Sequence, residues 1–281
     1  MYNTLISVKS LKEHLNRPDW QVFDCRHELK DVEAGRKAYA SGHIPGALFA
    51  HMDDDLSGEI IPGTTGRHPL PAPDQFLETL QNWGLNEDTQ VVVYDDKGGG
   101  LAARMWWMLK AMGHEQVAVL NGGLQAWEAA GHDLSTEIPQ VPKGNISLNM
   151  QEGVAVNVKE VEEKSKSGQG ILIDARAAMR YKGEMEPIDP VAGHIPRAIS
   201  APWMENLGED KHFLSAAELK ARFEGILGEH APSESICYCG SGVTACHNLL
   251  AMEYAGLTGA KLYPGSWSHW ITDAGREIEK S

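Results

Sequence analysis

The sequence predicts an α/β protein of two similar halves, each a parallel sheet with helices on both faces. Short apolar runs of strand length alternate with segments of helix length, and the same order of motifs occurs twice. The chain also has 281 residues, more than the ~100–200 that one domain usually holds. We therefore expect domains at residues 1–134 and 148–281, joined by a linker at 135–147 that is rich in proline.

The first half alternates strands and helices between glycine-rich turns. The expected strands are short and apolar, as in a parallel sheet covered on both faces, and they lie at residues 21–24, 91–94 and 117–120. The expected helices lie at residues 8–15, 74–83, 101–112 and 123–130. Asp74 is expected to cap the second of these, and Gly84 to end it.

The second half repeats this order. A helix is expected at residues 158–164, a strand at 171–174, and a strand ending before Cys239 that leads into a helix at 246–255. The turn Gly193-His194-Ile195-Pro196 repeats Gly42-His43-Ile44-Pro45. Matches in the same order indicate an internal duplication.

Cys239 and Asp95 occupy equivalent places after apolar strands of the two halves. Ligands of such sheets bind at the carboxyl ends of the strands. Because an aspartate cannot act as a sulfur nucleophile, we expect only the second half to be catalytic.

The composition limits the partners and the compartment. The net charge is −14, from 39 acidic and 25 basic residues, so neither nucleic acid nor an anionic membrane is expected as a partner. No apolar run reaches the ~18 residues of a membrane helix, and residues 1–5 do not resemble a signal peptide. We expect a cytoplasmic protein whose four cysteines form no disulfide framework.

The segment around Cys239 predicts a reactive thiolate. An apolar strand leads into a loop with Gly240 and Gly242, and a helix follows. Converging backbone N–H groups and the positive end of the helix dipole favour an anionic sulfur. Cys237 and Cys246 are expected in the core, and no metal is expected because the local Cys and His residues lack a CxxC pair.

These features together resemble the tandem-domain rhodaneses, the thiosulfate and 3-mercaptopyruvate sulfurtransferases. The resemblance covers essentially the whole chain, through the paired Gly-His-Ile-Pro turns, the strand ends Asp24-Cys25-Arg26 and Asp174-Ala175-Arg176, and one cysteine loop. The loop at 239–245, Cys-Gly-Ser-Gly-Val-Thr-Ala, is similar to the mercaptopyruvate type.

The resemblance implies a function without a cofactor. Sulfur would pass from 3-mercaptopyruvate to a persulfide on Cys239, and then to cyanide or a thiol such as a reduced small thiol or a thioredoxin-like protein. Family members that prefer thiosulfate typically have basic residues after the cysteine, where this chain has Gly240 and Ser241. The expected contacts to a monoanionic keto acid are the Ser241 hydroxyl and the loop amides of Gly240, Gly242, Val243 and Thr244.

The resemblance also implies charged and proton-transfer groups. Arg180 matches the substrate-anion arginine of the family, but Ile188 follows Glu186-Pro187 where the mercaptopyruvate branch commonly has a second arginine. Arg197 is the candidate replacement, and His43 is a candidate for a proton relay through Ser241. Arg26, Arg176 and His194 are expected to be structural, because the same residue type stands at the equivalent place in the other half.

Three other functions have the same loop type. A cysteine-dependent phosphatase would need an arginine at the position of Ala245, so this chemistry is not expected. A non-enzymatic persulfide carrier would need the same stabilised sulfur, and turnover would separate it from an enzyme. A thiosulfate:cyanide sulfurtransferase is the alternative within the family.

Overall fold

The computed structural model describes residues 1–281, which form two compact units. Unit 1 consists of residues 1–58, 70–151 and 209–213, and unit 2 of residues 59–69, 152–208 and 214–281. Residues 135–147 belong to unit 1, where Ile146 is buried and the N–H of Gly144 donates to the carbonyl of Gln81 at 2.8 Å. None of the helices combines the length and apolar character needed to cross a membrane.

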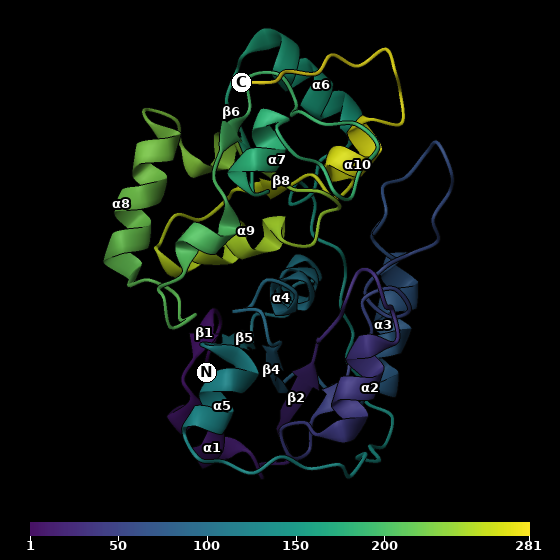
Figure 1. Cartoon of the computed structure of the whole chain (residues 1–281). Coiled ribbons are helices and arrows are strands. Elements are labelled where there is room, and N and C mark those ends of the chain that lie inside the picture. The colour runs from purple at the N-terminus through teal and green to yellow at the C-terminus, as the bar shows by residue number, and fades with distance from the viewer. The chain divides into compact units, whose positions relative to one another are not determined.

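Unit 1 contains a five-stranded sheet in the order β1-β5-β4-β2-β3, with every neighbouring pair parallel (Figure 1). Its strands are β1 (Leu5–Ile6), β2 (Trp20–Asp24), β3 (Leu48–Phe49), β4 (Gln90–Tyr94) and β5 (Val117–Leu120). Its helices are α1 (Val8–His14), α2 (Ala34–Ser41), α3 (Pro73–Asn82), α4 (Ala102–Ala111) and α5 (Gly123–Ala129).

Both faces of the unit 1 sheet are covered, as predicted. Val92 on β4 belongs to the cluster that contains Leu11 of α1 and Trp127 of α5. The alternate residues Val91 and Val93 point to the opposite face and are also fully buried. Burial on both faces explains why this strand has an uninterrupted apolar sequence.

Unit 2 contains a four-stranded parallel sheet in the order β7-β6-β8-β9. Its strands are β6 (Ile171–Asp174), β7 (Ile199–Ser200), β8 (Ser235–Tyr238) and β9 (Lys261–Leu262). Its helices are α6 (Val158–Ser167), α7 (Ala178–Lys182), α8 (Ala216–Leu227), α9 (Ala245–Tyr254) and α10 (Ser266–Trp270). The two parallel α/β sheets confirm the predicted fold class, and Cys239 follows β8, an interior strand, as Asp95 follows β4.

The helices differ from the expectations in two respects. Helix α3 begins at Pro73 with Ala72 as its N-cap, so Asp74 lies in the first turn and the expected cap is wrong. Proline is favoured at this first position because it needs no N–H partner there. Helix α8 was not expected, although Ser215 and Glu218 form a capping box whose sequence pattern signals a helix start.

A buried Asp–Arg pair ends one strand in each unit, which confirms the structural interpretation. Arg26 contacts Asp24 at 2.6 Å and donates to the carbonyl of Gly42 at 2.7 Å. Arg176 contacts Asp174 at 2.6 Å and donates to the carbonyl of Gly193 at 2.7 Å. Each arginine thus joins a strand end to a Gly-His-Ile-Pro turn.

Removal of the Asp24 carboxylate is expected to destabilise the fold strongly. Asp24→Ala leaves the guanidinium of Arg26 buried without its charge partner, which costs about 3–5 kcal/mol. Urea unfolding followed by tryptophan fluorescence measures this loss. Asp19→Ala is the matched control, because Asp19 pairs with Arg17 at the same sequence spacing on the surface and its removal should leave the midpoint unchanged. Similar midpoints for both variants would contradict a stabilising role for the buried pair.

Candidate active site

The Cys239 loop holds its sulfur in a buried, hydrogen-bonded position. Cys239 is 1% exposed, and the N–H of Gly242 donates to Sγ at 3.2 Å. The N–H of Cys239 itself donates to Ser266 Oγ at 3.0 Å. A backbone N–H aimed at the sulfur stabilises a thiolate relative to a thiol.

Gly242 must be glycine for this loop to form. Its φ is +79°, and a Cβ at this position would lie 2.3 Å from the carbonyl oxygen of Pro264. A side chain would therefore collide with backbone and also strain the chain. The close approach fixes the N–H that points at the sulfur of Cys239.

The equivalent loop of unit 1 already contains an anion. Asp95 accepts four backbone hydrogen bonds, two on each carboxylate oxygen, from Lys97 at 2.8 Å, Gly99 at 2.8 Å, Leu101 at 2.7 Å and Ala102 at 2.8 Å. The loop geometry thus forms a cradle for a negative charge, and in unit 1 a resident side chain occupies it. In the equivalent loop of unit 2 this place is held by Cys239, the candidate nucleophile.

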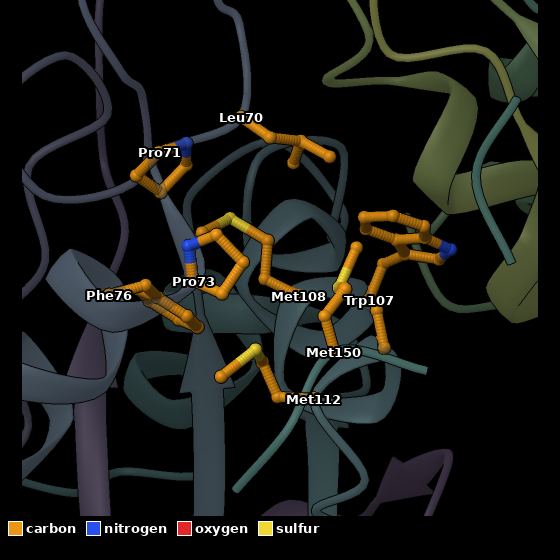
Figure 2. Close-up of a pocket in the computed structure, with 9 residues that line it drawn as sticks. Leu70, Pro71, Pro73, Phe76, Trp107, Met108, Met112 and Met150 are labelled. Carbon is orange, nitrogen blue, oxygen red and sulfur yellow. The ribbon is translucent and has the colours of Figure 1, made fainter. Parts of the chain in front are cut away.

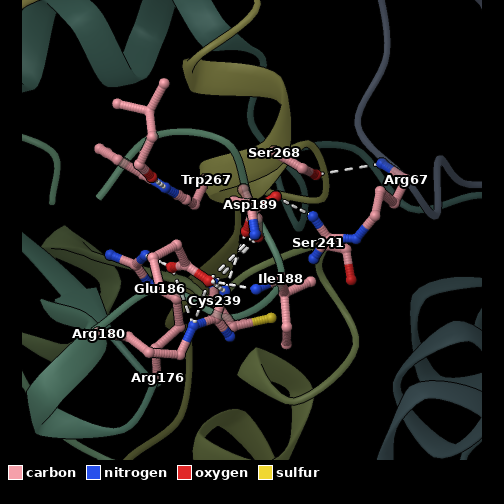
Figure 3. A network of polar contacts seen from close by, with 12 residues as sticks. Arg67, Arg176, Arg180, Glu186, Ile188, Asp189, Cys239, Ser241, Trp267 and Ser268 are labelled. Atoms are coloured by element: carbon pink, nitrogen blue, oxygen red, sulfur yellow. Dashed lines mark hydrogen bonds and ion pairs between the residues drawn. The ribbon is translucent and has the colours of Figure 1, made fainter. Parts of the chain in front are cut away.

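Two arginines flank the loop beside Cys239 (Figure 3). A Cβ on Gly240 would lie 3.0 Å from Nη2 of Arg67 and 3.5 Å from Nη1 of Arg180. The absent side chain at position 240 thus leaves room for both guanidinium groups. Arg180 was expected near the loop, whereas Arg67 was not.

Acidic side chains hold these arginines in place. Arg180 donates through Nε to Glu186 at 2.9 Å and through Nη2 to Asp189 at 2.9 Å, while Asp189 also pairs with Nη1 of Arg67. Burial would raise the pKa of Glu186, but its hydrogen bonds with Arg180 and nearby amides lower that pKa overall. Burial raises the pKa of Asp189, and the charge of Arg67 offsets only part of this effect.

Ser241 is hydrogen bonded to His68 rather than to His43. His68 Nδ1 lies 2.8 Å from Ser241 Oγ, and both residues are buried. His43 instead bonds through Nδ1 to the carbonyl of Tyr39 at 2.8 Å and through Nε2 to the carbonyl of Glu137 at 3.0 Å. These bonds use both ring nitrogens of His43, which makes it a structural residue of its turn.

Arg197 does not join the loop. Its N–H donates to Glu279 at 3.0 Å, and its guanidinium lies beside Gly168, which precedes strand β6. That location is the amino end of the parallel sheet, whereas Cys239 follows the carboxyl end of β8. The expected replacement of a missing substrate arginine by Arg197 is therefore incorrect.

Arg67 and His68 come from the segment 59–69, which the sequence identifies only as part of a loop. A Cβ on Gly66 would lie 2.5 Å from the carbonyl oxygen of Gly265, and the N–H of Arg67 donates to Ser268 Oγ at 3.1 Å. The N–H of Ser268 in turn donates to the carbonyl of Gly240 at 2.9 Å. The one available sequence signal was a Gly-Arg-His run in a long loop, where functional residues are common.

The neighbouring cysteines and a tryptophan belong to the core. Burial raises the pKa of the Cys237 thiol, and Cys246 is fully buried. Trp267 is also fully buried, and its indole N–H donates to the carbonyl of Val191 at 2.9 Å. These residues pack beneath the loop and leave Cys239 as the candidate nucleophile.

A separate cavity of about 140 Å³ lies in unit 1 and has an apolar lining (Figure 2). Its walls are formed by Leu70, Pro71, Pro73, Phe76, Trp107, Met108, Ala111, Met112 and Met150. None of these side chains is an acid, a base or a thiol nucleophile, so the cavity offers no group for the chemistry of Cys239.

Comparison with known proteins identifies the repeated domain. A family model described as "Rhodanese-like domain" matches residues 7–130 and 157–273. The chain is 44% identical over 275 residues to a probable 3-mercaptopyruvate sulfurtransferase of Pseudomonas aeruginosa, covering 98% of this chain and 97% of that protein. It is 38% identical over 258 residues to a putative thiosulfate sulfurtransferase, SseB, of Mycobacterium tuberculosis, covering 92% and 89%.

A solved structure agrees with these matches. The crystal structure of SseA from Escherichia coli, described as a 3-mercaptopyruvate sulfotransferase with the rhodanese fold, superposes with a TM-score of 0.81 at 32% identity. The match covers 95% of this chain and 100% of that chain. The resemblance inferred from the sequence is thus confirmed for both halves.

Substitution of Gly242 is expected to damage both the loop and the fold. Gly242→Ala should lower the thermal midpoint by roughly 4–8 °C, as expected for a strain of about 2 kcal/mol. It should also slow alkylation of Cys239 by iodoacetamide, because the N–H of residue 242 would move away from the sulfur. Gly225→Ala in helix α8 is the control, since a Cβ there meets no atom within 4 Å and alanine favours a helix. Equal midpoints and alkylation rates in the two variants would contradict this account.

Proposed function

The chain belongs to the rhodanese family, and we propose that it is a sulfurtransferase that moves sulfur from 3-mercaptopyruvate, through a persulfide on Cys239, to a thiol or cyanide. The observation that carries the proposal is the N–H of Gly242 at 3.2 Å from Cys239 Sγ, in a loop whose twin holds the Asp95 carboxylate. The relative from P. aeruginosa, named a probable 3-mercaptopyruvate sulfurtransferase, supports the choice of donor.

The first half-reaction is nucleophilic. The Cys239 thiolate attacks the sulfur of 3-mercaptopyruvate, an S–S bond forms, and the C–S bond breaks with its electron pair moving to carbon. The resulting enolate takes up the thiol proton of the substrate and leaves as pyruvate, so the persulfide remains as an anion. Loop amides such as that of Gly242 stabilise this anion by donating to sulfur.

Ser241 and His68 form the proton path for this step. Their contact of 2.8 Å permits a proton to pass between the Ser241 hydroxyl and the His68 imidazole. Which ring nitrogen of His68 carries a proton then changes from one step of the reaction to the next. Both groups are buried, so bulk water does not compete for the proton. We assign them the transfer of the substrate thiol proton to the departing enolate.

The substrate carboxylate binds beside Gly240. Nη2 of Arg67 and Nη1 of Arg180 both face this position, and a planar guanidinium matches a carboxylate well. The loop amides of Gly240, Val243 and Thr244 contribute further donors around the reacting carbon and sulfur. The arrangement binds a three-carbon keto acid whose sulfur reaches Cys239.

The second half-reaction passes the outer sulfur to an acceptor. Cyanide attacks this sulfur to give thiocyanate, or a thiolate attacks it to give a new persulfide, and either reaction returns the Cys239 thiolate. A reduced small thiol or a thioredoxin-like protein is the proposed thiol acceptor. We propose a cytoplasmic location, because reducing conditions keep both the nucleophile and the acceptor as thiols.

Intact mass measurement combined with a pyruvate assay tests this function. After 3-mercaptopyruvate is added, the protein should gain the mass of one sulfur atom and release pyruvate over many turnovers when cyanide is present. Cys239→Ser should lose both signals, whereas Cys237→Ala, which removes a buried core thiol, should keep them. The specificity constant for 3-mercaptopyruvate should exceed that for thiosulfate.

Three outcomes would redirect the assignment. Activity retained by Cys239→Ser would rule out Cys239 as the sulfur carrier. A single turnover without catalytic pyruvate release would favour a persulfide carrier. Equal or reversed specificity constants would favour a thiosulfate sulfurtransferase.

Removal of the Arg180 side chain is expected to weaken use of the keto acid. A hydrogen bond to a charged group contributes about 1.5–3 kcal/mol, so Arg180→Ala should raise the KM for 3-mercaptopyruvate by about 10–150-fold. Arg222→Ala is the control, because Arg222 pairs with Glu205 at 2.9 Å, as Arg180 pairs with Asp189, but does not reach Gly240. Steady-state kinetics separates KM from kcat, and an unchanged KM in Arg180→Ala would remove this arginine from the substrate site.

A further inference from the structure

Asp189 joins two arginines that come from distant parts of the sequence. One carboxylate oxygen pairs with Nη1 of Arg67, and the other accepts from Nη2 of Arg180 at 2.9 Å. The Asp189 side chain is only 2% exposed. A buried carboxylate that accepts one N–H from each arginine has the geometry expected for the carboxylate of a bound substrate.

The acids bind some of the nitrogens of the two arginines, while Nη2 of Arg67 and Nη1 of Arg180 have no contact with them. Glu186 accepts from Nε of Arg180, and Asp189 accepts from one terminal nitrogen of each arginine. Nη2 of Arg67 and both terminal nitrogens of Arg180 lie against Gly240, and Nε of Arg67 is buried with no hydrogen-bond partner. Donors therefore remain for a ligand at the loop after the acids are bound (Figure 3).

The charges of this cluster balance before any substrate binds. Arg67 and Arg180 contribute two positive charges, and Glu186 and Asp189 contribute two negative charges. Arg176 and Asp174, which adjoin the cluster through a contact of 3.3 Å between Arg176 and Glu186, form a further balanced pair. An incoming anion thus meets oriented N–H donors without an excess of positive charge.

We infer that Asp189 determines donor selectivity: by neutralising one of the two arginine charges, its carboxylate makes the site accept a monoanionic keto acid and reject a dianion such as thiosulfate. The inference rests on the proposed function and adds the residue that sets its substrate class. Because Glu186 balances the other arginine charge, every negative charge on the donor adds to a buried site without net charge, so a dianion is disfavoured more strongly than a monoanion. Asp189 acts through Arg67 and Arg180 and is a positioning residue.

The two acids differ in how firmly they hold their charge. The pKa of Glu186 is lowered and that of Asp189 is raised, with burial as the largest influence on the latter. Glu186 contacts both Nε and Nη2 of Arg180, whereas Asp189 contacts only Nη2. Replacing Asp189 therefore leaves both contacts between Arg180 and Glu186 in place.

The test is the ratio of the specificity constants for 3-mercaptopyruvate and thiosulfate, measured with cyanide as acceptor. Asp189→Asn keeps the shape of the side chain and removes its charge, so the ratio should fall at least about tenfold, mainly through a lower KM for thiosulfate. Asp189→Glu keeps the charge and should stay within about threefold of the wild-type ratio. Glu205→Gln, which removes an acid paired with Arg222, should leave the ratio unchanged.

An unchanged ratio in a folded Asp189→Asn variant would overturn the inference, while pyruvate release by the wild-type protein would still support the proposed function. No pyruvate release by the wild-type protein would overturn both. If Asp189→Asn does not fold, the inhibition constants of a monoanion and a dianion for the wild-type protein test the inference instead. Pyruvate, a monoanion, should then inhibit with a constant at least about tenfold lower than that of sulfate, a dianion, and equal constants would overturn the inference.

Discussion

A buried sulfur anion needs N–H donors aimed at it. This requirement explains how strand β8, Gly242 and the loop around Cys239 are arranged in unit 2. Strand β8 carries Cys239 to the edge of the sheet, and Gly242 turns its N–H toward the sulfur because no side chain blocks its approach to Pro264. The N–H groups of Trp267 and Ser268 then fix the carbonyls of Cys239 and Gly240 at 2.9 Å each. Hydrogen bonds from N–H groups of the loop and hydrogen bonds to its carbonyl groups thus both hold the loop in place.

The duplication provides an internal comparison for this loop. In unit 1 the amides of the equivalent loop bind the carboxylate of Asp95, so that loop holds a resident side chain and has a structural role. In unit 2 a cysteine replaces the aspartate. Its side chain is shorter, because it ends in one sulfur atom instead of a carboxylate group. Under the proposed function, the outer sulfur of a persulfide on Cys239 would accept amide hydrogen bonds as the carboxylate oxygens of Asp95 do.

The sequence was sufficient to predict the two parallel sheets and the duplication, because apolar runs of strand length and repeated motifs are local patterns. It was insufficient for contacts between distant segments. His68 and Ser241 are 173 residues apart, and Arg67 and Asp189 are 122 residues apart, so no spacing rule links them. Arg180 was expected near the loop but not Arg67, which folding also brings to Gly240. Asp189 then balances part of the charge of these arginines.

We propose that the loop at 239–245 binds a persulfide anion, and a crystal structure of the protein after reaction with 3-mercaptopyruvate tests this most directly. We expect the outer sulfur to lie inside the loop and to accept hydrogen bonds from its amides, as the Asp95 carboxylate does in the other unit. An outer sulfur that points away from the loop and receives no amide hydrogen bond would contradict it.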